Sequence, residues 1–206
     1  MLLGAILGWS AVFLQPYLII INRVATVPET IIRFFSFYTI LTNILVACYF
    51  SSLWLKPNSR ASKFFSREKL VTAITLYIIV VGATYNIILR QLWSPQGLQL
   101  IVDELLHSVI PVFFIVYWLI CIPKGELEWK NVLSWLIYPL VYFICVLFRG
   151  ALPGYYPYPF LDVMKLGYNK VGLNSAILCG LFLLLGSILL LCDKLLKQKS
   201  ALQSQC

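Results

Sequence analysis

The chain has 206 residues, of which 61% are hydrophobic and 12% charged, and its formal net charge is +8. Soluble domains usually carry about 25% charged residues, so the composition excludes a soluble domain and makes lipid the main solvent of the chain. The positive charge does not indicate nucleic-acid binding, because in a membrane protein the distribution of Lys and Arg, which sets orientation, matters more than the sum.

Six stretches are long enough to cross a bilayer, which requires roughly 20 apolar residues per helix. Apart from Arg90, none of them contains Lys, Arg, Asp or Glu. We do not interpret the first as a signal peptide, because no Lys or Arg precedes it and it has no small-x-small cleavage site. The connecting segments are short, so we expect one all-α, polytopic membrane domain over residues 1–206, a six-helix bundle. Its spans are predicted near residues 3–22, 34–55, 70–92, 105–123, 131–148 and 171–192.

The basic residues predict the orientation of the spans. Six of the sixteen fall on one side and ten on the other, which is therefore cytoplasmic together with both termini, as expected for a multi-pass protein of the cell membrane. The basic segment 56–69 is expected to set this topology and to lie at anionic headgroups. The ten residues assigned to the cytoplasm are Lys56, Arg60, Lys63, Arg67, Lys69, Lys124, Lys130, Lys194, Lys197 and Lys199.

Cysteine and tryptophan have structural interpretations here. The six cysteines are scattered singly, with no C-x-x-C and no nearby histidine, so we expect no metal site, no disulfide framework and no cofactor. Cys206 is the last residue, so the prenylation pattern is not met either. Tryptophans near the span ends are expected at headgroup level, namely Trp9, Trp54, Trp93 and Trp129.

Ionisable and strongly polar residues inside spans are costly, so they are the first candidates for function. The second span carries Thr39, Thr42 and Asn43 at helical spacing, and Asn86 and Arg90 are four residues apart in the third. The fourth span opens on a cluster that includes the single histidine of the chain, namely Asp103, Glu104 and His107.

Depth predicts that three of these residues share one layer. Thr39, Asn86 and His107 each lie 17 residues from the nearest cytoplasmic lysine of their span. At 1.5 Å per residue they lie about 25 Å from that side, in a core about 30 Å thick. We therefore expect the second, third and fourth spans to meet in a polar layer under the outer surface. The Tyr-rich segment 149–170 is expected to cover that layer.

Each candidate also has a structural interpretation. Thr42 and Asn43 are of the kind that joins helices through hydrogen bonds, and His107 alone would more often pack against a neighbour. Arg90 lies close to a span end, from which it can extend to the outer headgroups.

Three sequence segments together resemble a known family. They are FYTILTN at 37–43, LLHSVIP at 105–111 and YPYPFLD at 156–162, and they resemble the androgen-induced membrane hydrolases, which cleave fatty acid esters of hydroxy fatty acids, and their bacterial relatives. The resemblance covers most of the chain and implies a threonine nucleophile at Thr39 and a catalytic histidine at His107. Vertebrate members carry Asp where this chain has Thr42 and His where it has Glu104, so their substrate is a poor guide here.

The same residues are chemically suited to ester hydrolysis. A threonine hydroxyl needs an adjacent base, and imidazole has a suitable unperturbed pKa of about 6.5. Asp103 or Glu104 can orient the His107 ring, and Asn43 or Asn86 can supply an N–H to the oxyanion.

A proline in the fourth span adds a further expectation. Pro111 cannot donate to the His107 carbonyl, which leaves that oxygen free for a side chain or water.

The expected function is therefore hydrolysis of a lipid ester that enters from the membrane. Two alternatives remain open. One is a transporter or lipid-binding protein that uses the same polar layer without turnover. The other is an assembly subunit in which these residues only join helices.

Overall fold

The six predicted spans are helical in the computed structural model, which describes residues 1–92, 94–152 and 154–203, with side chains up to 197. Within that part of the chain six helices are long and apolar enough to cross a membrane, and no strand occurs. This confirms the all-α class and a multi-pass membrane protein. Trp93, Cys206 and the Lys199 side chain lie outside what the structure describes. The six helices are Leu2–Ile21, Tyr38–Leu55, Glu68–Leu89, Leu98–Cys121, Trp129–Ala151 and Val163–Lys197.

Residue contacts divide the chain into two units, residues 1–123 and 124–206, and each is described by itself. The first unit holds the first four spans and the second holds the last two. The expectation of one six-helix bundle stays a prediction, as do the predicted orientation and the covering role of segment 149–170.

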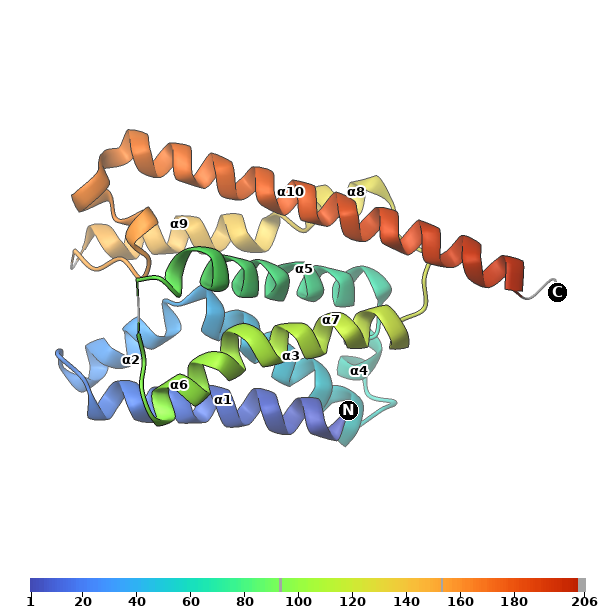
Figure 1. Cartoon of the computed structure of the whole chain (residues 1–206), viewed down its shortest axis with the longest axis horizontal. Helices are drawn as coiled ribbons and strands as arrows, with labels where there is room; N and C mark the ends of the chain where they lie inside the picture. The colour runs from blue at the N-terminus through green and yellow to red at the C-terminus, as the bar shows by residue number, and fades with distance from the viewer. Residues whose placement is uncertain (93, 153, 204–206) are drawn as a thin grey trace. The chain divides into compact units, whose positions relative to one another are not determined.

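In the first unit, helices α1 (Leu2–Ile21) and α3 (Tyr38–Leu55) pack closely through small residues. A Cβ atom at Gly8 would lie 2.8 Å from the Ala47 Cβ, and one at Gly4 would lie 2.5 Å from the Phe50 ring. In a bilayer the hydrophobic effect does not drive helices together, so their association relies on close van der Waals packing. Small residues four apart allow the two helix backbones to approach closely enough for such packing. Figure 1 shows α1 along the lower edge of this unit and α3 running obliquely behind α7.

Helices α5 (Glu68–Thr84) and α7 (Ile110–Cys121) complete the core of the first unit. The Trp118 indole N–H donates to the Thr72 hydroxyl at 2.8 Å, which joins α7 to α5. Tyr49 and Tyr117 share a hydrogen bond of 3.0 Å between their hydroxyls, which joins α3 to α7. At the other end of the spans, Gln99 donates to Gln15 at 3.0 Å.

Two short helices precede and follow α3, and neither was predicted from the sequence. Helix α2 (Val27–Phe35) has a proline in its first turn and a salt bridge of 2.8 Å between Arg33 and Glu29. The chain leaves helical geometry at Phe37, so the second span begins at residue 38 rather than at 34. Helix α4 (Arg60–Phe65) lies in the basic segment and is N-capped by Ser59, whose hydroxyl accepts the Ser62 N–H.

Two of the spans contain a single π-helical turn. Helix α5 continues into η1 (Tyr85–Leu89), and α6 (Leu98–Glu104) continues into η2 (Leu105–Val109) before α7. The Arg90 N–H donates to the Tyr85 carbonyl at 2.8 Å, and the Ile110 N–H donates to that of Leu105, each five residues back. Such turns occur frequently at functional sites, and here the two contact each other.

The second unit contains α8 (Trp129–Ser134), α9 (Ile137–Ala151), the short η3 (Pro159–Leu161) and α10 (Val163–Gln203), which is interrupted at Gly167 with φ 74°. The segment between α9 and α10 folds onto these helices. Asn174 donates to the Phe160 carbonyl at 2.9 Å, and the Tyr156 ring fills the space over Gly150. Burial raises the pKa of the Tyr156 hydroxyl above its ordinary value.

A buried carboxylate holds the segment before α8. Asp193 is 0% exposed, and both of its carboxylate oxygens accept the Gly125 N–H at 3.0 Å. The Lys197 ammonium donates to the Gly125 carbonyl at 3.2 Å. A Cβ atom at Gly125, whose φ is 111°, would lie 2.1 Å from the Lys197 side chain. The polar groups at this end of α10 thus serve to position a turn.

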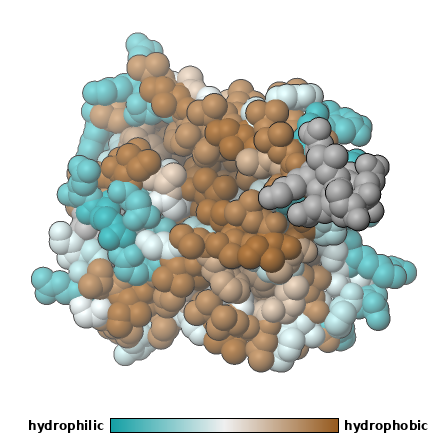
Figure 2. Space-filling view, turned by 45° about the vertical axis from the view of Figure 1, so that its right-hand side comes forward, coloured by the Kyte–Doolittle hydropathy of each residue, from teal (hydrophilic) through white to brown (hydrophobic). Residues whose placement is uncertain are grey.

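Large apolar side chains are exposed along the spans, as lipid requires. Figure 2 shows apolar residues covering much of the visible surface, with polar residues toward its edges. Ile87, Val112, Ile120 and Phe148 are each more than half exposed. In water such a surface would be an association site, but in a bilayer it faces acyl chains.

Candidate functional site

The imidazole of His107 is held in one orientation by its own helix. Its Nδ1 lies 2.9 Å from the carbonyl oxygen of Asp103 and 3.9 Å from the Asp103 carboxylate. A carbonyl oxygen can only accept, so Nδ1 carries the hydrogen of this bond. In the neutral ring Nε2 is then the proton acceptor. The π-helical turn therefore presents a base in a fixed tautomer.

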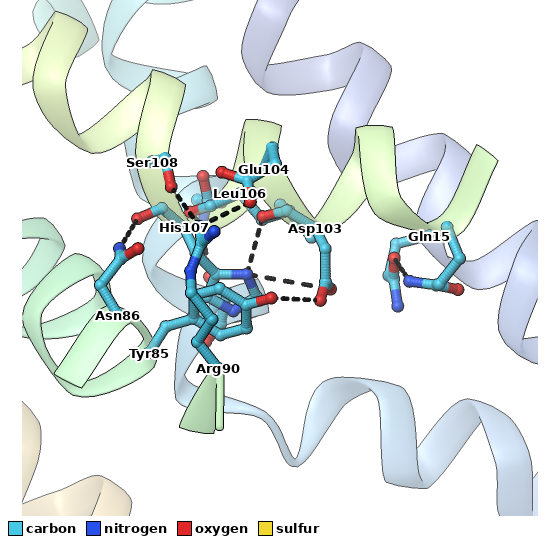
Figure 3. A network of polar contacts seen from close by, with 12 residues as sticks. Gln15, Tyr85, Asn86, Arg90, Asp103, Glu104, Leu106, His107 and Ser108 are labelled. Carbon is cyan, nitrogen blue, oxygen red and sulfur yellow. Dashed lines mark hydrogen bonds and ion pairs between the residues drawn. The ribbon is translucent and has the colours of Figure 1, made fainter. Parts of the chain in front are cut away.

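Tyr85 fixes the same ring from the facing helix. Its ring stacks on that of His107, with centroids 3.9 Å apart and planes 14° apart. Figure 3 shows both residues within the polar cluster. Its hydroxyl donates to Asp103 Oδ2 at 2.8 Å. Tyr85 is 4% exposed and Asp103 5%, so this contact is dry. One tyrosine thus supports both the histidine and the carboxylate beside it.

The sequence left open which carboxylate faces the histidine, and the structure separates the two. Asp103 lies beside His107, whereas Glu104 forms an ion pair with Arg90. Arg90 also donates to the Ser108 hydroxyl at 3.2 Å, and its guanidinium lies 5.3 Å from the Tyr85 ring centroid. The hydrogen bond to Glu104 raises the pKa of Arg90 above its ordinary value.

Arg90 is therefore a member of the polar cluster. Its side chain is 44% exposed, and an ion pair at that exposure contributes little to stability. Its position at the rim places a cation next to the histidine, with Glu104 as its counterion.

Pro111 leaves main-chain oxygens in need of donors, and two asparagines supply them. The Leu106 carbonyl would bond the residue-111 N–H in a π turn and the His107 carbonyl would bond it in an α turn, but proline has none. Asn43 Nδ2 donates to Leu106 O at 3.3 Å, and Asn86 Nδ2 donates to His107 O at 3.2 Å. Of the two partners expected for the His107 carbonyl, a side chain or water, the structure shows a side chain, that of Asn86.

Helix α5 can approach the His107 turn because residue 82 is glycine. A Cβ atom at Gly82 would lie 3.1 Å from the His107 carbonyl oxygen and 3.2 Å from the Pro111 Cβ. The Gly82 carbonyl also accepts Asn86 Nδ2, at 2.9 Å.

The second, third and fourth spans meet at this cluster, as the depth argument predicted. Asn43 on α3 bonds the η2 main chain, and Tyr85 and Asn86 on η1 bond Asp103 and His107. The Asn43 amide also donates to the Thr39 carbonyl at 2.9 Å. One nitrogen therefore ties the turn of Thr39 to the turn of His107.

Thr39 and Thr42 lie in the first two turns of α3. Thr39 is 6% exposed and Thr42 is fully buried. Both therefore belong to the protein interior and not to the lipid-facing surface. All three candidate residues of this span, Thr39, Thr42 and Asn43, are therefore buried within the first unit.

The two asparagines already use their donors. Asn43 gives its amide hydrogens to Thr39 O and Leu106 O, and Asn86 gives its own to Gly82 O and His107 O. A contact from either to an oxyanion would replace one of these bonds. Asn43 Oδ1, in contrast, is a buried acceptor without a hydrogen-bond partner.

Sequence reasoning missed Tyr85 and Ser108. Tyr85 was hidden in an apolar span that is rich in aromatic residues, and Ser108 follows His107 directly. The available signal for Tyr85 was its hydroxyl, which requires a partner when a tyrosine is buried. Which tyrosine is buried beside a carboxylate depends on how the helices pack.

In the described part of the chain, no group of three or more His, Cys, Asp or Glu side chains has an arrangement that could hold a metal ion.

Replacing Asn43 by alanine is expected to lower stability by about 1–2 kcal/mol, because the Leu106 carbonyl then loses its donor in a dry site. The measurement is thermal unfolding of the purified protein in one detergent. Ser52→Ala is the matched control, since the Ser52 hydroxyl bonds only the Tyr49 carbonyl on the same helix. Equal melting temperatures for the two variants would contradict the bridging role of Asn43.

The chain was also compared with known proteins. No family model, no curated protein and no solved structure matches it. The cluster is therefore interpreted from its own geometry, and the resemblance noted in the sequence supports a proposal only.

Proposed function

We propose that this chain is a membrane hydrolase that cleaves a lipid ester, with Thr39 as the nucleophile and His107 as the general base. The observation that carries the proposal is the state of the histidine. Its Nδ1 hydrogen is committed to the Asp103 carbonyl, so Nε2 is the basic atom. The stacked Tyr85 ring and the hydrogen bond from Tyr85 to Asp103 hold the plane of the imidazole beside a buried carboxylate, which supports a role for His107 as a base.

The reaction proceeds in two steps. In the first, the Thr39 hydroxyl attacks the ester carbonyl carbon while His107 Nε2 takes its proton, and the leaving alcohol then receives that proton. In the second, water attacks the acyl-threonine and gives a proton to His107, which passes it to the Thr39 oxygen as the acid leaves and the hydroxyl is restored. Asp103 stabilises the imidazolium that forms in each step.

The substrate is a lipid because the cluster lies within apolar spans. Arg90 is the exposed cation at its rim and can attract a polar or anionic group of the substrate.

The basic segment 56–69 has an exposed pair of its own. Arg67 lies over the Phe64 ring at 5.6 Å, and Phe64 is half exposed. This pairing of cation and aromatic ring supports a contact between segment 56–69 and anionic headgroups of the cell membrane.

The test is covalent labelling. The full chain in phosphatidylcholine nanodiscs is treated with a fluorophosphonate probe, and the modified residue is located by mass spectrometry. We expect one label, on Thr39, and its formation should slow when a lipid ester is added. A chain that binds lipid saturably yet is never labelled and turns over no ester would instead support the lipid-binding or transport alternative.

Tyr85→Phe keeps the stacked ring and removes the hydrogen bond to Asp103. Because the Asp103 carboxylate then lacks a donor in a dry site, we expect kcat to fall about 10-fold with KM little changed. Tyr85→Leu also removes the stacking and should lower kcat further. The two constants are measured with a fluorogenic lipid ester. If KM rises while kcat is unchanged, Tyr85 contacts the substrate and does not position the histidine.

A further inference from the structure

An apolar groove lies outside the polar cluster, between α1, α2 and α3. It has a volume of about 330 Å³ and is lined by eleven residues. Trp9 and Phe13 form part of one wall, where their rings stack with centroids 5.3 Å apart. Ile31 and Phe35 of α2 line the groove from the other helix, and Ile44 of α3 completes the lining.

The two polar side chains that line this groove are already paired. The Trp9 indole N–H donates to the Ser51 hydroxyl at 2.8 Å, and the Thr30 hydroxyl donates to the Thr26 carbonyl at 2.9 Å. An occupant therefore meets an almost entirely apolar lining. This favours a hydrocarbon chain over a peptide or a sugar, whose polar groups would be left unpaired.

The groove fits one acyl chain in length. Trp9 and Ile20 line it eleven residues apart on α1, which corresponds to about 16 Å at the helical rise. One leaflet of a 30 Å hydrocarbon core is about 15 Å deep. A second copy of the chain is a poorer fit, because a stable protein interface takes roughly 20–30 residues from each side.

A cation lies at the end of the groove where α1 terminates. Arg23 is exposed and donates from Nη1 to the carbonyl of Ile20, a lining residue, at 3.0 Å. This bond uses one of its five N–H donors. The acid nearest in sequence, Glu29, is engaged by Arg33 at 2.8 Å. The end of the groove is therefore suited to a phosphate.

We propose that this groove is a binding site for one phospholipid with an anionic headgroup, taken from the leaflet at the α1 C-terminus. One acyl chain lies along Trp9, Phe13, Ile31 and Phe35, and the phosphate lies at Arg23. The proposal does not depend on catalysis, since it uses none of the residues of the polar cluster.

The experiment uses the full chain in vesicles of phosphatidylcholine and phosphatidylglycerol at 3:1. A trace of phosphatidylglycerol carrying a diazirine in mid-chain is photolysed, and the labelled residues are found by mass spectrometry. In a parallel sample, the same diazirine-bearing acyl chain is attached to phosphatidylcholine. We expect labels to concentrate on Phe13, Ile31 and Phe35, with at least a threefold excess for phosphatidylglycerol that Arg23→Gln removes.

Two neighbouring isoleucines of α2 provide a matched pair. Ile31 lines the groove, and Ile32 is similarly exposed but does not. Ile31→Trp fills the groove and should lower groove labelling at least fivefold, whereas Ile32→Trp should leave it unchanged. Equal effects of the two variants, or labels spread evenly over lipid-facing residues such as Ile87 and Ile120, would overturn the proposal. So would equal labelling by the two headgroups.

Discussion

Thr39→Ala is expected to abolish both covalent labelling and ester turnover, with a loss of at least roughly 10³-fold in kcat. The physical reason is that the acyl intermediate has no oxygen on which to form once the hydroxyl is removed. The Thr39 turn should persist, because its link to η2 runs from the main-chain carbonyl through Asn43. The measurement is labelling with the fluorophosphonate probe and hydrolysis of a fluorogenic lipid ester.

Three further variants make this result specific. Thr39→Ser restores a hydroxyl and should retain labelling. Thr75→Ala removes a fully buried hydroxyl that donates to the Val71 carbonyl on its own helix, and should leave labelling unchanged. Ser108→Ala removes the hydroxyl next to the histidine. If Ser108→Ala loses the label and Thr39→Ala keeps it, the nucleophile is Ser108 and the assignment to Thr39 is wrong.

His107→Gln should lower kcat by roughly 10²–10⁴-fold, the usual contribution of a general base. Glutamine approximates the reach of the imidazole and can donate to the Asp103 carbonyl, but its amide oxygen is too weak a base to take a proton from threonine. The loss should therefore appear in turnover at saturating ester, with melting temperature close to that of the parent protein.

Asn86→Ala is the control for that experiment. It removes the donor to the His107 carbonyl but not the base, so turnover should fall far less than in His107→Gln. A histidine variant that hydrolyses the ester at the parental rate would show that His107 is a packing residue.

The sequence alone predicted the spans because lipid leaves the backbone few options. An apolar segment of about 20 residues must satisfy its own N–H and carbonyl groups, so length and composition are sufficient. The common depth of Thr39, Asn86 and His107 was predictable for the same reason, since the rise per residue is fixed. The sequence also predicted that the His107 carbonyl lacks its usual helical donor, because Pro111 has no N–H.

The short helices α2 and α4 were not predicted, since nine and six residues are too few to form a stable helix alone. They depend on packing against neighbouring helices and on the residues that begin them.

Only the tertiary structure decided how the polar side chains pair. Asp103 and Glu104 are adjacent on one helix and therefore point in different directions, so the packing of α6 selects which one lies beside His107. The two π turns shift the hydrogen-bond register by one residue, and we find no local sequence pattern that predicts this shift. Tyr85 and His107 lie on different helices and contact each other. Such a contact depends on how whole helices pack, and sequence periodicity does not encode that packing.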